Sequence, residues 1–337
     1  MQISHFHKYL ADFDPYVRQF LNSRPALPND FDLMLRYAMG WVDANGQSHT
    51  SPTGKRIRPI LLMLCTEASG GDWQAALPAA AAVELLHNFS LIHDDIQDNS
   101  PLRHNRPTVW KIWGAPNAIN AGDALFTLAF SALAELASNL APEHVLSIWN
   151  IFNYTALELT RGQHLDMRFE NQRDVTTEAY ISMITGKSAA LLAACAQIGS
   201  LIAVVDPGTA SKYYDFGLNI GIAFQIHDDI LGIWGDSSIT GKSVATDILS
   251  RKKSLPVLYG LAKSPELQTL YQRQLFTESD VSEVVEILNH VEAQHYAYEQ
   301  EKLYYQKAIN ALESANPEGK PAGNLMQLVE GLFQRIH

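Results

Sequence analysis

Long apolar segments with a helical period dominate this sequence and constrain its fold more than any other feature. From about residue 75 to residue 98, alanine, leucine and isoleucine recur on more than one helical face, which is typical of a helix that is buried nearly all round. Alternating β-branched runs, which would predict strands, are absent. Further helices are expected over residues 118–136, 145–169, 177–202, 209–234 and 281–314. The sequence therefore predicts an all-α fold.

Clusters of turn-forming residues separate these segments, at positions 51–54, 69–72, 206–208 and 316–319. The first fifty residues carry weaker signals, and we expect them to add variable helices to the outside of a core over residues 51–337. A length of 337 residues would also allow two domains. Because no linker or repeat interrupts the helical pattern, we interpret residues 1–337 as a single domain.

Charge and composition exclude some classes of partner. The net charge is −11, which disfavours nucleic-acid binding because such binding relies on Lys and Arg at phosphates. Charged residues make up only 18% of the chain, below the roughly 25% of an average domain, which suggests a surface buried in an oligomer. Cys65 and Cys195 lie in apolar surroundings and are expected to be free thiols in a reducing cytoplasm. The amino terminus does not resemble a signal peptide, and we expect no membrane span, since no uninterrupted apolar run approaches about 18 residues.

Two clusters of aspartates are embedded in the apolar segments. Asp94, Asp95 and Asp98 end one predicted helix, and Asp228 and Asp229 lie near the end of another. A lone pair of aspartates would be interpreted as surface acids on a helix end. Here the surrounding residues belong in a core, where a carboxylate must be paired or must coordinate a cation. Two such clusters predict a shared site for a hard cation such as Mg²⁺, since neither has Cys ligands.

Basic residues flank both clusters and suit a diphosphate ligand, since Arg and Lys are the usual phosphate-binding side chains. Each of them alone would be interpreted as a solvated surface charge, but together they indicate an anion site beside the two acidic clusters. They are Lys55, Arg56, Arg58, Arg103, Arg106, Lys187, Lys242, Lys252 and Lys253.

Five motifs occur in one order along the chain: GKRIRP at 54–59, DDIQD at 94–98, GQHLD at 162–166, GKS at 186–188 and FQIHDD at 224–229. With these motifs the sequence resembles the trans-polyprenyl diphosphate synthase family, in particular short-chain farnesyl and geranylgeranyl diphosphate synthases, over roughly residues 54–256. The resemblance implies an all-α bundle around a deep central cavity, usually as a homodimer. It also implies a Mg²⁺-dependent prenyltransferase that condenses an allylic diphosphate with isopentenyl diphosphate, with a product of fifteen to twenty carbons and geranylgeranyl diphosphate favoured.

The resemblance also implies roles for individual residues. Asp94, Asp95 and Asp98 would hold magnesium on one side of the allylic diphosphate, and Asp228, supported by Asp229, would hold a further magnesium opposite. We expect Asp94, Asp98, Asp228 and Lys187 to be catalytic. Phe89, five residues before Asp94, and its neighbour Ser90 are expected to set the chain length. The substrate-binding residues implied are Lys55, Arg58, His87, Arg103, His104, Lys187, Ser188, Gln225, Lys242 and Lys252.

Three positions depart from the family pattern. His104 stands where the family usually has a second arginine that binds isopentenyl diphosphate, Gly232 stands where a third aspartate is common, and Thr53 replaces a glycine. His104 leaves open a terpene synthase or cyclase on the same scaffold, although Lys55, Arg58 and His87 argue against it. A non-catalytic subunit of a heteromeric synthase is the other alternative, and the complete acidic clusters argue against that one.

Overall fold

The computed structural model describes residues 6–48, 56–172, 174–235, 246–249, 251–273 and 277–333. The chain divides into two compact units, which are described separately here as unit 1 and unit 2. Unit 1 comprises Met1–Ala156, Ala194–Tyr213 and Asn316–Leu328, and unit 2 comprises Leu157–Ala193, Tyr214–Ala315 and Val329–His337. That the chain is one domain stays a prediction.

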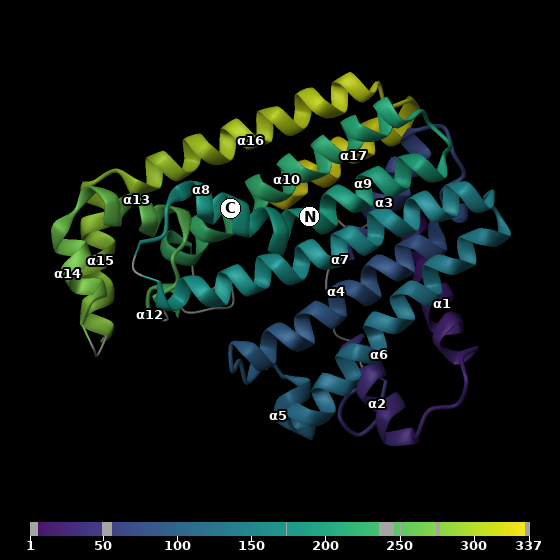
Figure 1. Ribbon diagram of the computed structural model, residues 1–337, viewed down its shortest axis with the longest axis horizontal. Coiled ribbons are helices and arrows are strands. Elements are labelled where there is room, and N and C mark those ends of the chain that lie inside the picture. Colours follow the sequence, from purple (N-terminus) through teal and green to yellow (C-terminus); the bar gives the residue numbers. More distant parts are fainter. Residues whose placement is uncertain are drawn as a thin grey trace. The chain divides into compact units, whose positions relative to one another are not determined.

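Almost all regular structure in the described residues is helical (Figure 1), which confirms the predicted all-α class. The only two strands found there, β1 (Leu102–Arg103) and β2 (Arg106–Pro107), form a small antiparallel hairpin. The helices that begin before residue 185 are α1 (His7–Asn22), α2 (Asn29–Ala38), α3 (Ile57–Ala68), η2 (Trp73–Ala76), α4 (Leu77–Gln97), α5 (Val109–Trp113), α6 (Ala115–Ala134), η3 (Glu135–Ser138), α7 (Pro142–Asn171) and α8 (Thr177–Ile184). The later ones are η4 (Thr185–Ala189), α9 (Ala190–Ile202), α10 (Pro207–Trp234), α12 (Thr246–Leu249), α13 (Leu255–Lys263), α14 (Pro265–Tyr271), α15 (Glu278–His290), α16 (Ala293–Ala315) and α17 (Gly319–Phe333).

Two predicted helices differ from the structure in detail. The expected helix over 281–314 is two helices, because α15 ends at His290 and Glu292 adopts a left-handed conformation with φ 58° before α16 begins. No glycine or proline marks this break in the sequence, so the apolar pattern alone runs through it. The segment 177–202 is helical throughout, but its middle, η4, is a turn of π-helix. The turn expected at 51–54 lies outside the described residues.

Unit 1 is organised around α4, which lies alongside α6 and α3, with α1 packed against α3 and α4 (Figure 1). Four consecutive alanines of α4, residues 79–82, are fully buried, as the apolar pattern on more than one face predicts. Small side chains let α4 and α6 approach closely. A Cβ on Gly122 of α6 would lie 2.3 Å from Nε2 of His93 on α4, which is too close for any other residue without a shift.

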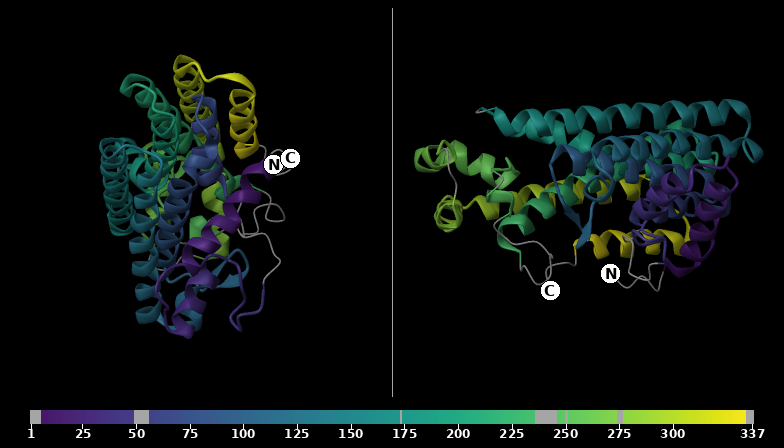
Figure 2. Two further views of the ribbon diagram at one scale, coloured as in Figure 1. Left: turned by 90° about the vertical axis from the view of Figure 1, so that its right-hand side faces the viewer. Right: turned by 90° about the horizontal axis from the view of Figure 1, so that it is seen from below.

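In unit 2, α13 packs against α8, α15 and α16. One apolar cluster joins α8, α10 and α13 through Tyr180, Ile226 and Leu258, and a second joins α13 to α15 through Val257 and Leu288. The views in Figure 2 show α14 and α15 beside each other at one end of this unit, in agreement with their contacts. The core of unit 2 therefore gathers around α13 and the second half of α10.

Three helical stretches are long and apolar enough to cross a membrane by length and composition alone: Trp73–Gln97, Ala115–Ser138 and Thr177–Ile202. These stretches qualify by average composition although polar residues interrupt their apolar runs, so the absence of a membrane span stays a prediction. Helices buried inside a large bundle have the same composition as membrane spans. In the first and third stretches, 67% of the apolar window is buried inside the protein, against 39% in the second.

Candidate active site

The first acidic cluster lies at the carboxyl-terminal end of α4 in unit 1. Asp94 and Asp95 belong to its last turn, and Asp98 caps it by donating its backbone N–H to the Asp94 carbonyl. Asp95 is buried and Asp98 is exposed. Asp94 and Asp98 are four residues apart and so share one face. The carbonyl end of a helix carries partial negative charge, so three carboxylates there disfavour one another and favour a bound cation.

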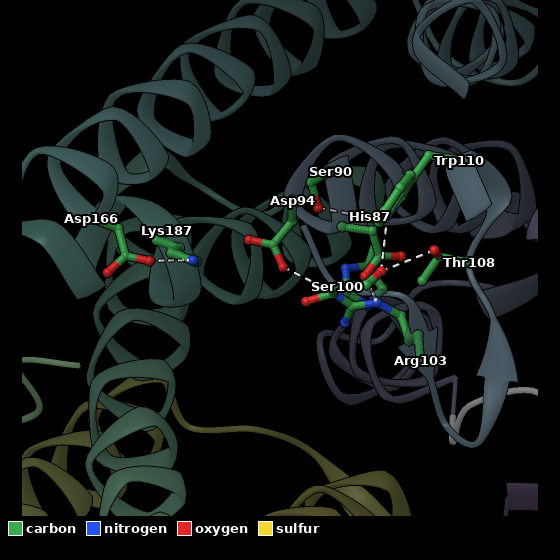
Figure 3. A network of polar contacts seen from close by, with 10 residues as sticks. His87, Ser90, Asp94, Ser100, Arg103, Thr108, Trp110, Asp166 and Lys187 are labelled. Carbon is green, nitrogen blue, oxygen red and sulfur yellow. Dashed lines mark hydrogen bonds and ion pairs between the residues drawn. The ribbon is translucent and has the colours of Figure 1, made fainter. Parts of the chain in front are cut away.

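Arg103 on β1 bridges two of these carboxylates, and its contact with Asp94 is drawn in Figure 3. Its Nε lies 2.8 Å from Oδ1 of Asp95, and one of its terminal nitrogens lies 2.9 Å from Oδ2 of Asp94. Burial raises the pKa of Asp95 to about 6; Arg103 opposes this, while Asp94 and Asp98 add to it. One guanidinium thus contacts two of the three carboxylates at this end of α4.

The β1–β2 hairpin holds Arg103 in place through contacts that the sequence did not reveal. Its two turn residues, His104 and Asn105, both have positive φ (51° and 61°), as a tight hairpin turn requires. The Ser100 carbonyl accepts hydrogen bonds from Thr108 Oγ1 and Trp110 Nε1, both at 2.9 Å (Figure 3). These bonds fasten the hairpin to the loop that leaves α4.

Arg106 fastens the other side of the hairpin to the amino-terminal region. Its guanidinium lies 4.3 Å from the ring centre of Tyr37 on α2 and donates to the Val42 carbonyl at 2.9 Å. The Tyr37 hydroxyl donates to the Pro107 carbonyl at 2.6 Å. Arg106 therefore has a structural role here.

His87 and Arg58, both predicted to bind substrate, lie in contact in unit 1. An Arg58 terminal nitrogen lies 3.1 Å from Nε2 of His87. Since a guanidinium can only donate, Nε2 is the acceptor and the ring is neutral. Burial, with the charges of Arg58, Arg103, Arg56 and His104, lowers the pKa of His87 well below its ordinary value of 6.5. Lys55, another predicted substrate-binding residue, lies outside the described residues.

A buried ion pair positions the start of α3, which carries Arg58. Arg56 pairs with Glu84 of α4, both largely buried, and also donates to the Met39 carbonyl at 3.1 Å. Arg56 has φ 48°, a left-handed conformation that is rare for residues other than glycine. Asn88 donates to the same Glu84 carboxylate at 3.1 Å. Sequence reasoning grouped Arg56 with the phosphate-binding cations, but its visible partners are protein groups.

Phe89 starts an aromatic column in unit 1. Its ring lies 4.9 Å from that of Phe126 on α6, which lies 5.1 Å from that of Phe130. Phe130 in turn contacts Trp149 and Phe152 of α7. Ser90, which is predicted to set the chain length together with Phe89, donates a hydrogen bond from its hydroxyl to the His87 carbonyl at 2.8 Å (Figure 3).

The second acidic cluster lies on α10 in unit 2, where the two aspartates differ. Asp229 is 1% exposed, and its carboxylate accepts hydrogen bonds from Tyr180, from the Leu255 backbone N–H at 3.1 Å and from Gln225 Nε2 at 3.2 Å. Burial raises its pKa to about 6, against the opposing charge of Lys252 and these hydrogen bonds. Asp228 is only partly buried. Asp229 is therefore the enclosed carboxylate of the pair and Asp228 the more accessible one.

The predicted residues Lys187, Ser188 and Gln225 come together in unit 2. Ser188 Oγ donates to Oε1 of Gln225 at 2.5 Å, and Lys187 pairs with Asp166 of α7 (Figure 3). Asp166 belongs to the GQHLD motif, but sequence reasoning assigned it no role. Lys187 and Ser188 lie in the π-helical turn η4, a distortion that is frequent at functional sites.

Close backbone contact between α7 and η4 makes this arrangement possible. A Cβ on Gly162 would lie 2.1 Å from the Lys187 backbone nitrogen, and one on Gly186 would lie 2.6 Å from the Glu158 carbonyl oxygen. Any side chain at either position would push η4 away from α7. The glycines of the two motifs thus bring Lys187 within reach of Asp166.

Whether these residues hold a metal can be judged from the donor set. Among the residues that the structure describes, no group of three or more His, Cys, Asp or Glu side chains is arranged to hold a metal ion by itself. Carboxylates in ones and twos suit Mg²⁺, which keeps several waters and usually binds through one or two carboxylates together with substrate phosphates. The donors therefore fit a cation that arrives with a diphosphate. Lys242 lies outside the described residues, and the other metal and diphosphate roles stay predictions.

The comparisons with known proteins agree with the resemblance. The polyprenyl synthetase family model matches residues 39–288. A geranylgeranyl diphosphate synthase of Saccharolobus solfataricus is 42% identical, with 84% of this chain and 86% of that protein covered. A (2E,6E)-farnesyl diphosphate synthase of Mycobacterium tuberculosis is 35% identical, with 90% and 85% covered. The crystal structure of a geranylgeranyl pyrophosphate synthetase from Pyrococcus horikoshii matches with a TM-score of 0.86 at 32% identity, covering 98% of both chains.

The lowered pKa of His87 predicts a stability that falls in acid. Below about pH 6.5 the unfolded chain binds a proton that folded His87 does not, so stability is lost as pH falls, by up to about 1.4 kcal/mol per pH unit. We expect His87→Gln to lose less stability than the wild type between pH 7.5 and pH 5.5 in urea unfolding. His144→Gln, at an exposed position, should behave as the wild type. Parallel losses in His87→Gln and the wild type would show that the site does not hold His87 neutral.

Proposed function

The chain belongs to the polyprenyl synthetase family, and we propose that it makes geranylgeranyl diphosphate from an allylic diphosphate and isopentenyl diphosphate with Mg²⁺. It is a short-chain trans-prenyltransferase. The observation that carries the proposal is the acidic end of α4, where Arg103 bridges Asp94 and Asp95. A site with these charged side chains suits a cation together with a diphosphate and does not suit a neutral substrate.

The described residues supply the groups that the reaction needs. Arg103 beside the first acidic cluster, and Lys187 and Lys252 near the second, would supply positive charge to oppose the negative charge that develops on the departing diphosphate, which is the usual source of electrostatic catalysis. A divalent cation held by Asp94 and Asp98, and a further one held by Asp228, would neutralise part of that charge. Arg58 and neutral His87 would hold the second diphosphate by hydrogen bonds. The apolar helices around each cluster exclude water, which would otherwise quench the allylic cation.

A twenty-carbon product is supported by the aromatic column that begins at Phe89. Family members commonly use the position five residues before the first aspartate as the floor of the prenyl-chain site, and here it carries a large ring backed by Phe126. The 42% identity to a geranylgeranyl diphosphate synthase points to the same length.

A homodimer is supported by apolar side chains on the surface of unit 1. Ile119 of α6 and Leu146 and Tyr154 of α7 are 43%, 61% and 61% exposed. Exposed apolar residues of this size on neighbouring helices are typical of an interface. Two buried free thiols, Cys65 and Cys195, support a cytoplasmic location.

A product assay tests the proposed reaction. With farnesyl diphosphate, labelled isopentenyl diphosphate and Mg²⁺, we expect labelled geranylgeranyl diphosphate, identified by mass spectrometry after phosphatase treatment. With farnesyl diphosphate alone we expect no hydrocarbon product, whereas a terpene synthase would release one. Formation of cyclic or dephosphorylated products without isopentenyl diphosphate would reject the proposal.

Metal dependence is tested by chelation and by two aspartate variants. EDTA should abolish turnover and excess Mg²⁺ should restore it, because the carboxylates are expected to act through the cation. Asp94→Asn and Asp228→Asn should each lower kcat by roughly two orders of magnitude or more, with circular dichroism unchanged. Asp215→Asn is the matched control, an exposed aspartate on the same helix as Asp228. Near-normal turnover in either active-site variant would remove that residue from the metal site.

Phe89→Ala should lengthen the product. Removing the ring frees space that further prenyl carbons can occupy, with about 0.8 kcal/mol gained for each methylene buried. Because Phe126 lies next to Phe89, we expect a limited extension in Phe89→Ala and a larger one in Phe89→Ala combined with Phe126→Ala. Chain lengths are measured by thin-layer chromatography of the dephosphorylated products. An unchanged distribution in both variants would place the floor elsewhere.

A further inference from the structure

Two adjacent lysines, Lys252 and Lys253, lie on a short segment that leads into α13 in unit 2. We call residues 251–255 the strap. The resemblance to known synthases assigns a diphosphate contact to Lys252 only. The two side chains have different surroundings, and those of Lys253 point to a role that neither the motifs nor the proposed reaction explains.

The Lys253 side chain binds the carboxyl-terminal end of α7. Its Nζ donates to the carbonyl oxygens of Phe169, at 2.6 Å, and of Gln172. The last carbonyls of a helix have no partner within the helix, and positive charge is favourable there. Burial lowers the pKa of Lys253, opposed by Asp174 and Glu170. Phe169 is itself buried in the core of unit 2, so the anchor point is fixed.

The strap has a second anchor two residues further on. The Leu255 backbone N–H donates to Oδ2 of Asp229 at 3.1 Å, and the Leu255 side chain is fully buried. Ser254, between the two anchors, is extended, with φ −72° and ψ 165°, and is 1% exposed. The strap is therefore fixed from residue 253 into α13.

Lys252 directly precedes the first of these anchors. Its charge acts on Asp229, where it opposes the effect of burial on the carboxyl pKa. A lysine has a long flexible side chain that loses rotamer freedom when it is held. Because the neighbouring backbone is fixed, the Lys252 side chain has less conformational freedom to lose when substrate binds.

We propose that Lys253 is a positioning residue, which caps α7 and so holds the strap in the register that presents Lys252 to the allylic diphosphate. Lys253 itself touches no substrate. This inference rests on the proposed function, in which Lys252 contacts that diphosphate. It adds a requirement that the family motifs do not contain, namely that the end of α7 and the strap stay joined.

Steady-state kinetics of five variants test the proposal: Lys253→Met, Lys253→Arg, Lys252→Met, the double Met variant, and Lys302→Met as a control at an exposed lysine of α16. We expect Lys253→Met to lower kcat/KM for the allylic diphosphate about tenfold, as for other supporting residues, with KM for isopentenyl diphosphate unchanged. Lys253→Arg should retain most activity, because a guanidinium can cap the same carbonyls. In the Lys252→Met background, Lys253→Met should cost little more, because both act through one side chain.

Hydrogen exchange by mass spectrometry gives a readout that does not depend on activity. Lys253→Met should speed exchange in peptides that cover residues 165–172 and 251–258, where opening is local, and Lys302→Met should not. If Lys253→Met does not fold, Lys253→Gln, which can still donate a hydrogen bond, takes its place. Wild-type kinetics, equal loss for both substrates, full additivity with Lys252→Met or unchanged exchange would each overturn the proposal. An inactive wild type would instead reject the proposed function, while the exchange data would still test the anchor.

Discussion

The burial of carboxylates at the ends of apolar helices is the constraint on which this structure depends. Such groups are expensive to remove from water unless they gain partners or a cation. In unit 1 the partner is Arg103, and in unit 2 Asp229 receives three hydrogen bonds. Each solution requires a second element to be held close to an acidic helix: a hairpin in one case, and α8 with the strap in the other. Much of the local architecture follows from supplying those partners.

The sequence predicted those parts of the fold that leave a periodic pattern of apolar residues. The long apolar helices were predicted because burial on several faces leaves a pattern in the sequence. The break between α15 and α16 was not, because Glu292 adopts its left-handed conformation without a glycine to announce it. In unit 2, the motifs predicted roles for Lys187, Gln225 and Asp228. The GQHLD motif contains Asp166 but did not predict its pairing with Lys187, and no motif contains Tyr180, because a pairing between distant segments leaves no periodic signal.

The sequence also could not separate basic residues that are expected to contact substrate from basic residues that hold the surrounding structure in place. In the sequence alone, the basic residues near the acidic clusters form one class. In the structure Arg56 pairs with Glu84, Arg106 stacks on Tyr37 and Lys253 caps α7. Charge and position in the chain are similar for both kinds of residue, and only burial and partners tell them apart.

The contact between α2 and the hairpin changes how the amino-terminal region should be regarded in protein engineering. By sequence it resembles a dispensable extension, which invites truncation or replacement by a fusion partner. Yet Tyr37 supplies both the ring against Arg106 and the hydroxyl that binds the Pro107 carbonyl. A shortened chain lacking α2 would release the hairpin that carries Arg103. Domain boundaries for expression, or for chimaeras with other synthases, are therefore best drawn before α2 rather than after it.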